Sequence, residues 1–78
     1  MNKGNVQFIT KKSEQLRRIF EELQTKRDDL QEHYETASDK WQQSTKGEQM
    51  AANLSALEDA VNELEAALTS LETIAEYE

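Results

Sequence analysis

Residues 50–71, MAANLSALEDAVNELEAALTSL, decide the fold of this 78-residue chain. Apolar side chains recur there at alternating spacings of three and four residues, the pattern of a helix with one apolar stripe. Kept up over several heptads, this pattern is typical of a coiled coil, in which the stripe occupies heptad positions a and d. The a positions are Leu54, Val61, Leu68 and Ala75, and the d positions are Met50, Leu57, Leu64 and Leu71.

The first half of the chain repeats the pattern. Its a positions are Val6, Ser13, Phe20, Arg27, Tyr34 and Trp41, and its d positions are Ile9, Leu16, Leu23, Leu30 and Ala37. The absence of proline and the presence of only two glycines leave little to interrupt a helix. We therefore predict one all-α domain over residues 1–78, an antiparallel two-helix hairpin (coiled coil) with helices at about 5–43 and 46–77 and a turn at about 43–46.

Polar residues mark the ends of these helices. Thr45 and Glu48 have the spacing of a capping box and predict the start of the second helix. The alternative ends the first helix at Lys46 with Gly47 as a C-cap, which moves the turn by about two residues. At the other end of the chain Asn2, Gly4 and Asn5 are candidate caps, with Thr10 as a later alternative start.

Folding the chain at this turn predicts which residues face each other. The register that aligns a with d pairs Trp41 with Met50, Leu30 with Val61, Leu23 with Leu68 and Phe20 with Leu71. It also places Arg17 beside Glu72. Arg27, the charged residue in the seam, is expected to turn its guanidinium toward Glu63 or Glu65 and to specify register.

Charge and composition limit the range of possible functions. The chain has 16 acidic and 9 basic residues, a net charge of -7, and no cysteine, so it holds no disulfide or thiolate metal site. Residues 1–27 carry net +4 and residues 28–62 carry net -6. We find neither a signal peptide nor an apolar run of membrane-spanning length, and we therefore expect a cytoplasmic protein without membrane contact.

Two apolar features are left over by a single hairpin and predict a partner. The first, which we call the second stripe, consists of the g positions Ile19, His33, Ala60, Ala67 and Ile74. The second is an amino-terminal arm that extends beyond the second helix and contains Val6, Phe8 and Ile9. A second copy forming a four-helix bundle is the first interpretation; docking to a different protein and a disordered arm are the alternatives.

Acidic residues gather near the predicted turn and support a different function. This acidic surface would imitate DNA phosphates and inhibit a nucleic-acid-binding host protein, such as a defence nuclease or repressor. The simpler interpretation is that these carboxylates keep the protein soluble. The acidic surface consists of Asp28, Asp29, Glu32, Glu35, Asp39, Glu48, Glu58 and Asp59.

The residues give little indication of catalysis, metal binding or nucleic-acid binding. The apolar seam contains no carboxylate pair, no Ser-His-Asp set and no glycine-rich phosphate loop, so we expect no enzyme, small-molecule substrate or cofactor. His33, with Asp29 four residues earlier, lacks the further ligands of a helical metal site. The basic cluster of Lys11, Lys12, Arg17 and Arg18 has no interleaved aromatics, so we expect no direct contact with nucleic acid.

Residues 39–48, DKWQQSTKGE, followed by a leucine-rich acidic helix, resemble small helical-hairpin proteins of bacterial phages and prophages. A tryptophan at the bend of a two-helix hairpin also resembles the WXG family of small secreted bacterial hairpins, although glycine does not follow Trp41 at the second position. The first resemblance implies a phage origin and the second implies export. The leading prediction is a non-enzymatic, self-associating adaptor or scaffold.

Overall fold

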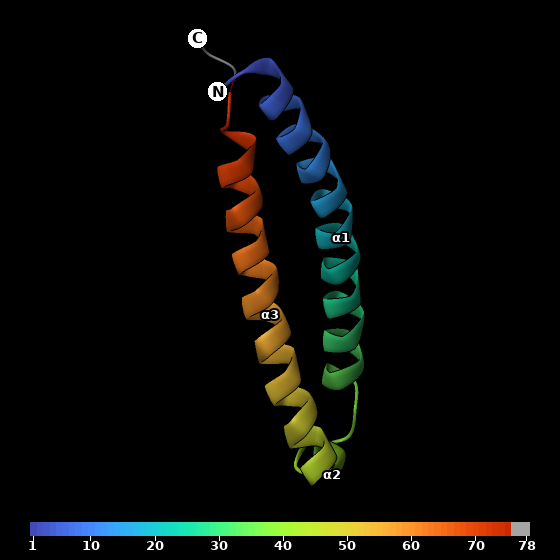
Figure 1. Cartoon of the computed structure of the whole chain (residues 1–78). Helices are drawn as coiled ribbons and strands as arrows, with labels where there is room; N and C mark the ends of the chain where they lie inside the picture. The colour runs from blue at the N-terminus through green and yellow to red at the C-terminus, as the bar shows by residue number, and fades with distance from the viewer. Residues whose placement is uncertain (76–78) are drawn as a thin grey trace.

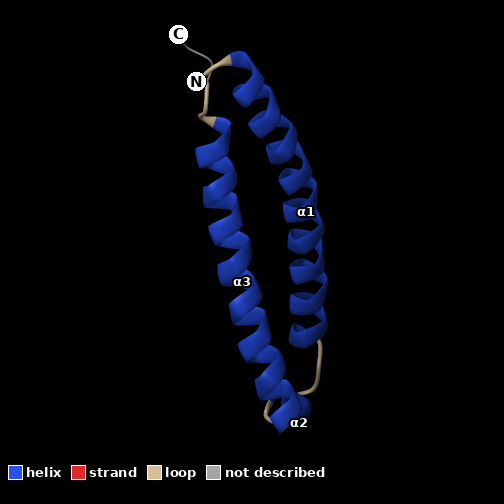
Figure 2. Cartoon of the chain, viewed as in Figure 1, coloured by secondary structure: helices blue, strands red, loops and turns tan. Residues whose placement is uncertain are grey.

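The computed structural model describes residues 1–75, and α-helix is the only regular secondary structure over that range. It contains α1 (Lys3–Glu35), the single-turn helix α2 (Asp39–Gln42) and α3 (Thr45–Glu72) (Figure 2). The helices α1 and α3 run side by side in opposite directions, with α2 at the closed end of the hairpin (Figure 1). The rod measures 61 × 15 × 13 Å. The predicted all-α class is confirmed.

The helix α1 begins where the sequence predicts and ends earlier. Asn2 is its N-cap, and its side-chain oxygen accepts a hydrogen bond from the backbone N–H of Asn5 at 2.8 Å. The helix ends at Glu35, whereas we predicted helix to about residue 43. Thr36 explains the difference, because its hydroxyl donates back to the carbonyls of Glu32 and His33 and competes with the continuing helix.

The connection between the long helices contains a turn of helix of its own. Ser38 caps α2 by accepting a hydrogen bond from the N–H of Trp41 at 3.2 Å. The amide of Gln42 reaches back and donates to the carbonyl of Tyr34 at 2.7 Å, which satisfies an acceptor at the end of α1. The segment from 36 to 44 is therefore an ordered connection, longer than the predicted turn at 43–46.

The cap of α3 lies one residue before the predicted capping box. Ser44, not Thr45, is the N-cap, and its hydroxyl accepts from the N–H of Gly47 at 3.1 Å. The helix ends at Glu72, where Thr73 is the C-cap and its hydroxyl donates to the carbonyl of Ser70. We predicted helix to about residue 77; residues 76 and 77 lie outside the described residues.

The core follows the predicted seam. The side chains of Leu68 and Val61 are 0% and 1% exposed, and Phe20 is also buried. Nearly every other described a and d residue is buried or half-buried, the exception being Ala75, which lies past the end of α3. The hydrophobic cluster at the centre of the rod contains Phe20, Val61 and Leu68, with Leu16, Leu23, Leu57 and Leu64 packed against it.

The members of this cluster show that the predicted register is wrong by one heptad. The predicted pairs Leu30 with Val61 and Phe20 with Leu71 would bring Leu30 and Leu71 into the central cluster, and neither is part of it. The observed cluster fits Phe20 level with Leu64 and Leu23 level with Val61. The cause is the early end of α1, which moves the turn toward the amino terminus by enough to shift the pairing by one heptad. The a positions of each helix still face d positions of the other.

Arg27 fits the corrected register. Its guanidinium lies 2.9 Å from the carboxylate of Asp28 and 3.5 Å from that of Glu58, rather than near Glu63 or Glu65 as predicted. The side chain is 16% exposed, so its stem lies within the seam while its charge is paired at the edge. The contact with Glu58 agrees with the one-heptad shift, which places residues 27 and 58 at similar heights along the rod.

Candidate partner-binding surfaces

The two sides of the hairpin seam have different chemistry. One side carries the e positions, which we call the charged flank: Arg17, Glu58, Glu65 and Glu72. The other side carries the second stripe. Two of the three ion pairs within residues 1–75 involve the charged flank, namely Arg17 with Glu72 and Arg27 with Glu58. The hairpin therefore has one side that carries two ion pairs within the chain and one side on which Ile19, Ala60 and Ala67 lie among the g-position lysines Lys12 and Lys26.

The structure places Ile19 of α1 and Ala60 and Ala67 of α3 on one side of the seam. Ile74, which lies past the end of α3, is instead beside Arg17 and Glu72 of the charged flank. Ile19 of α1 is 48% exposed, and in the corrected register it lies level with Ala67 of α3. Ala60 and Ala67 are exposed, and Ile74 is half-buried. His33 is exposed near the turn end, in a shallow depression lined by Asp29, Glu32 and Thr36, away from the apolar members.

The residues of the arm do not form one apolar surface. Val6 and Ile9 are half-buried, whereas Phe8 is 64% exposed. Phe8 lies outside the seam and precedes Ile19 by about three helical turns, so the two side chains share one face of α1. The ammonium group of Lys12 lies 5.5 Å from the centre of the Phe8 ring, a cation–π contact on the same face.

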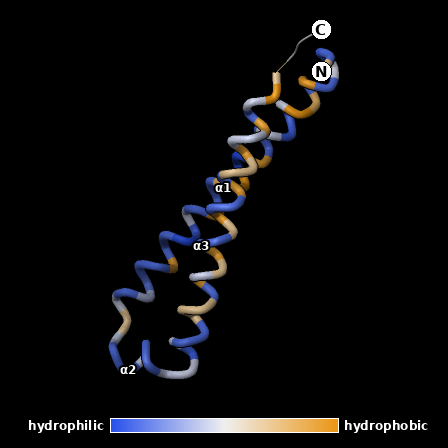
Figure 3. The backbone as a smooth tube through the Cα atoms, turned by 90° about the vertical axis from the view of Figure 1, so that its left-hand side faces the viewer, coloured by the Kyte–Doolittle hydropathy of each residue, from blue (hydrophilic) through white to orange (hydrophobic). Residues whose placement is uncertain are grey.

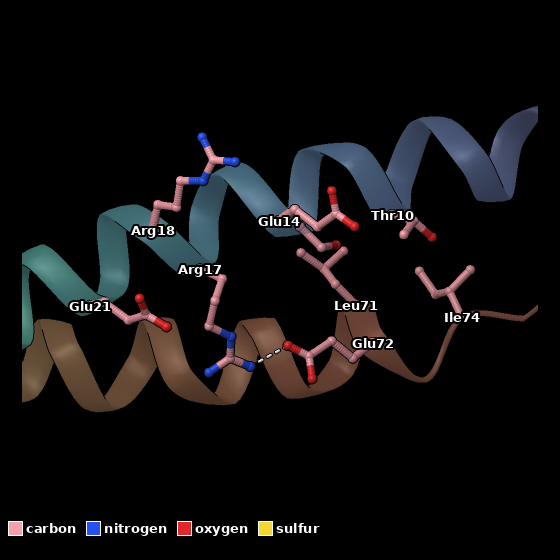
Figure 4. A pocket seen from close by; sticks show the side chains of 9 residues that line it. Thr10, Glu14, Arg17, Arg18, Glu21, Leu71, Glu72 and Ile74 are labelled. Carbon is pink, nitrogen blue, oxygen red and sulfur yellow. Dashed lines mark hydrogen bonds and ion pairs between the residues drawn. The ribbon is translucent and has the colours of Figure 1, made fainter.

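A groove at the open end of the hairpin was not predicted from the sequence. It has a volume of about 470 Å³ and lies between the first turns of α1 and the end of α3 (Figure 4). Ser13 is buried beside it and donates its hydroxyl to the carbonyl of Ile9 at 2.8 Å. The sequence signal was Ser13 itself, because a small residue at an a position opposite Leu71 fills less of the seam than leucine would.

One ion pair crosses this groove. The guanidinium of Arg17 donates a hydrogen bond to the carboxylate of Glu72, the contact that the sequence predicted (Figure 4). This hydrogen bond and the negative charge of Glu72 raise the pKa of Arg17 above its usual value. The charge of Arg17 is therefore already paired within the chain, and the groove presents it to a ligand only by breaking that contact.

All eight residues of the acidic surface are exposed, but three of them have partners. Asp28 and Glu58 contact Arg27, and Glu35 accepts a hydrogen bond from the amide of Gln31 at 3.0 Å. Five carboxylates make no ion pair within residues 1–75. The turn end of the rod is mostly hydrophilic in colour, in agreement with this distribution (Figure 3). The five carboxylates without an ion pair are Asp29, Glu32, Asp39, Glu48 and Asp59.

Comparison of the chain with protein-family models, with curated proteins and with solved structures found no match. Within residues 1–75, no helix has both the length and the apolar character needed to cross a bilayer. The same residues contain no group of three or more histidine and carboxylate side chains arranged to hold a metal ion.

Proposed function

We propose that this chain is a non-enzymatic adaptor or scaffold that associates with itself in the cytoplasm by packing of helices. The observation that supports the proposal is the difference between the two sides of the seam. The charged flank forms its ion pairs within the chain, whereas the second stripe exposes Ile19 beside the small residues Ala60 and Ala67. Small side chains allow another helix to approach closely, and burial of Ile19 provides a driving force.

A bundle of four helices is the expected form of the assembly. A lone two-helix hairpin of this length has a narrow core, and within residues 1–75 only Phe20, Leu54, Val61 and Leu68 are buried hydrophobic residues. Small domains commonly gain stability by oligomerisation when one core is insufficient. Two hairpins that share their second stripes would add the g positions to that core and give four helices around one axis.

Imitation of DNA by the acidic surface is the second candidate. All eight of its residues are exposed, which the interpretation requires. The density of these carboxylates along the rod is the reason that imitation of DNA is the second candidate. The eight carboxylates extend over about half of the 61 Å rod, or about one per 4 Å, whereas duplex DNA carries one charge per about 1.7 Å of axis. Partial neutralisation by Arg27 lowers the effective density further.

Analytical ultracentrifugation tests the proposal. We expect the wild-type chain to shift from monomer to dimer as its concentration rises, and Ile19→Asp to remain monomeric at concentrations where the wild type is a dimer. Thr25→Asp is the matched control, because it adds the same charge to an exposed position of α1 outside the second stripe. Equal dimerisation of the Ile19 and Thr25 variants would contradict a role for the second stripe.

A further inference from the structure

We infer that α1 of one chain docks on α3 of a second copy through two rows of residues with opposite charge. The row on α1 consists of Phe8, Lys12, Ile19 and Lys26, and the row on α3 consists of Asp59, Ala60, Glu63 and Ala67. This inference rests on the proposed self-association and adds which helices meet, which charges pair and how the copies are oriented.

The row on α1 combines apolar and basic groups on one face of the helix. Phe8 and Ile19 are two of the three exposed large hydrophobic residues of the described chain. Lys12 and Lys26 alternate with them along the same side. Neither lysine forms an ion pair with a carboxylate within residues 1–75, and the contact of Lys12 is with the ring of Phe8. The row therefore offers two unpaired positive charges to a partner.

The row on α3 has the complementary composition. Ala60 and Ala67 are exposed and small enough for Ile19 of another chain to lie against the helix. Asp59 and Glu63 are exposed and, like the two lysines, form no ion pair within residues 1–75. The last basic residue of the chain is Lys46, in the first turn of α3 and 13 residues before Asp59, so no lysine or arginine of α3 lies near these carboxylates.

The corrected register explains why the two rows do not satisfy each other within one hairpin. In that register Lys26 lies level with Ala60 and Ile19 lies level with Ala67, so each large residue of α1 meets a small one across the seam. Asp59 and Glu63 occupy heptad positions f and c, which point away from the α1 of their own chain. Their charges are therefore directed to where a second hairpin would lie.

The charge distribution along the rod indicates how the copies are oriented. Residues 28–56, which form the turn half, carry net -4, whereas residues 1–27 carry net +4. Copies running in the same direction would place both acidic halves together. Copies running in opposite directions separate them and lay α1 parallel to α3 of the other chain. With Ile19 against Ala67, Lys12 then lies beside Asp59 and Glu63, and Lys26, 14 residues further along α1, lies beyond these two carboxylates. The contact is then made twice, related by a two-fold axis.

Charge reversal in two separate chains tests this pairing. One variant carries Lys12→Glu, the lysine that faces the row on α3 in this orientation, and the other carries Asp59→Lys and Glu63→Lys. Each variant alone brings like charges together in both copies of the contact, and we expect its dimer to weaken by about tenfold or more. A mixture of the two restores opposite charges at both contacts, so we expect the mixed dimer to recover to within about threefold of wild type.

A matched control reverses one lysine outside the row, Lys11→Glu, which gives the same net charge as the first variant. We expect it to dimerise like the wild type, and circular dichroism of every variant verifies that each remains helical. A wild-type dimer that none of the reversals weakens would overturn the pairing of α1 with α3 and leave self-association standing. Reversals that weaken the dimer without recovery in the mixture would also overturn it.

Two results would overturn the self-association on which the inference rests. The first is a wild-type chain that remains monomeric at millimolar concentration. The second is a monomeric chain that binds vesicles of anionic phospholipid through Phe8 and the lysines, which would assign the row on α1 to a membrane surface. Either result is distinct from a dimer that ignores charge reversal, so failure of the proposed function and failure of this pairing are separable.

The orientation has its own readout. Because the chain has no cysteine, a single Gln43→Cys substitution places one spin label at the turn of each copy. Opposite orientations separate the two labels by about the 50 Å length of α1, whereas parallel orientations bring them close together. A short distance between the labels would overturn the antiparallel arrangement of the copies.

Discussion

Gly47 lies against the backbone carbonyl of Trp41 at the closed end of the hairpin. A Cβ atom at Gly47 would lie 2.6 Å from the carbonyl oxygen of Gln42 and closer still to that of Trp41. Both obstacles are backbone atoms, which move only if the α2 turn moves. The close approach of α2 to the first turn of α3 therefore depends on the absence of a side chain at position 47.

Substitution of Gly47 by alanine is expected to destabilise the protein. Alanine ordinarily stabilises a helix interior by about 0.5–1 kcal/mol relative to glycine, but here the clash should reverse the sign and cost about 1–3 kcal/mol. Gly4→Ala is the control, because its Cβ would meet only the side chain of Asn2 at 3.7 Å. Urea denaturation followed by circular dichroism measures both; equal stabilisation by the two substitutions would contradict the packing of α2.

Leu68→Ala is expected to remove most of the stability of the hairpin. Leu68 is 0% exposed and belongs to the central cluster, and leucine-to-alanine substitutions in cores cost about 2–5 kcal/mol. A core this small supplies only about 3–5 kcal/mol in total. Ile19→Ala, at an exposed position, is expected to change monomer stability by less than about 0.5 kcal/mol. Thermal melts at low protein concentration measure the stability of both variants. Equal losses of stability would show that Leu68 does not lie at the centre of the core.

The ion pair of Arg17 with Glu72 is expected to respond to charge exchange. Arg17→Glu should lower the melting temperature by placing two carboxylates together, and adding Glu72→Arg should restore it. Both effects should shrink at high salt, because the pair is exposed to solvent. Failure of the double variant to recover would show that the two side chains do not interact.

The pH dependence of this pair follows from the raised pKa of Arg17. A group whose pKa is raised by folding stabilises the protein below its unfolded pKa and loses that contribution only as the pH rises through the folded value. Both values lie above the range of ordinary measurement, since free arginine titrates above about 12. We therefore expect the contribution of the Arg17 guanidinium to stay constant from about pH 7 to about pH 10, measured by melting the Arg17→Gln variant beside the wild type.

Arg27→Leu is expected to increase the stability of the hairpin and to allow more than one register of its helices. Leucine would replace a largely buried charge in the seam, and such replacements are often neutral or stabilising by about 1–4 kcal/mol. Without the contacts to Asp28 and Glu58, the helices lose a feature that distinguishes one register from another. Urea denaturation measures the first effect, and ultracentrifugation detects mixed oligomers. A variant less stable than wild type would show that these ion pairs outweigh the burial of leucine.

The candidate surfaces were predicted unequally well from the sequence. The exposure of Ile19 and Phe8 follows from heptad positions, which the sequence displays directly. The pairing of Arg17 with Glu72 was also predicted, but from a register that differs by one heptad from the observed one, and it persists because the two long side chains span the difference. The groove beside Ser13 did not follow, because its volume depends on how far α1 and α3 separate at the open end. The cation–π contact of Lys12 with Phe8 was also missed, although the spacing of four residues on a helix was a signal for it.

The sequence by itself determined that the chain is all-helical and which side chains form the seam, because heptad spacing places a and d residues on one face whatever the partner. It could not determine the register, because a shift by one heptad again aligns a with d and changes only which leucines meet. The tertiary structure decided between these registers through the turn. The hydroxyl of Thr36 bonds to the helix backbone and ends α1 early. Because Gly47 has no side chain, α2 packs closely on the first turn of α3, and this contact fixes the register of the two long helices.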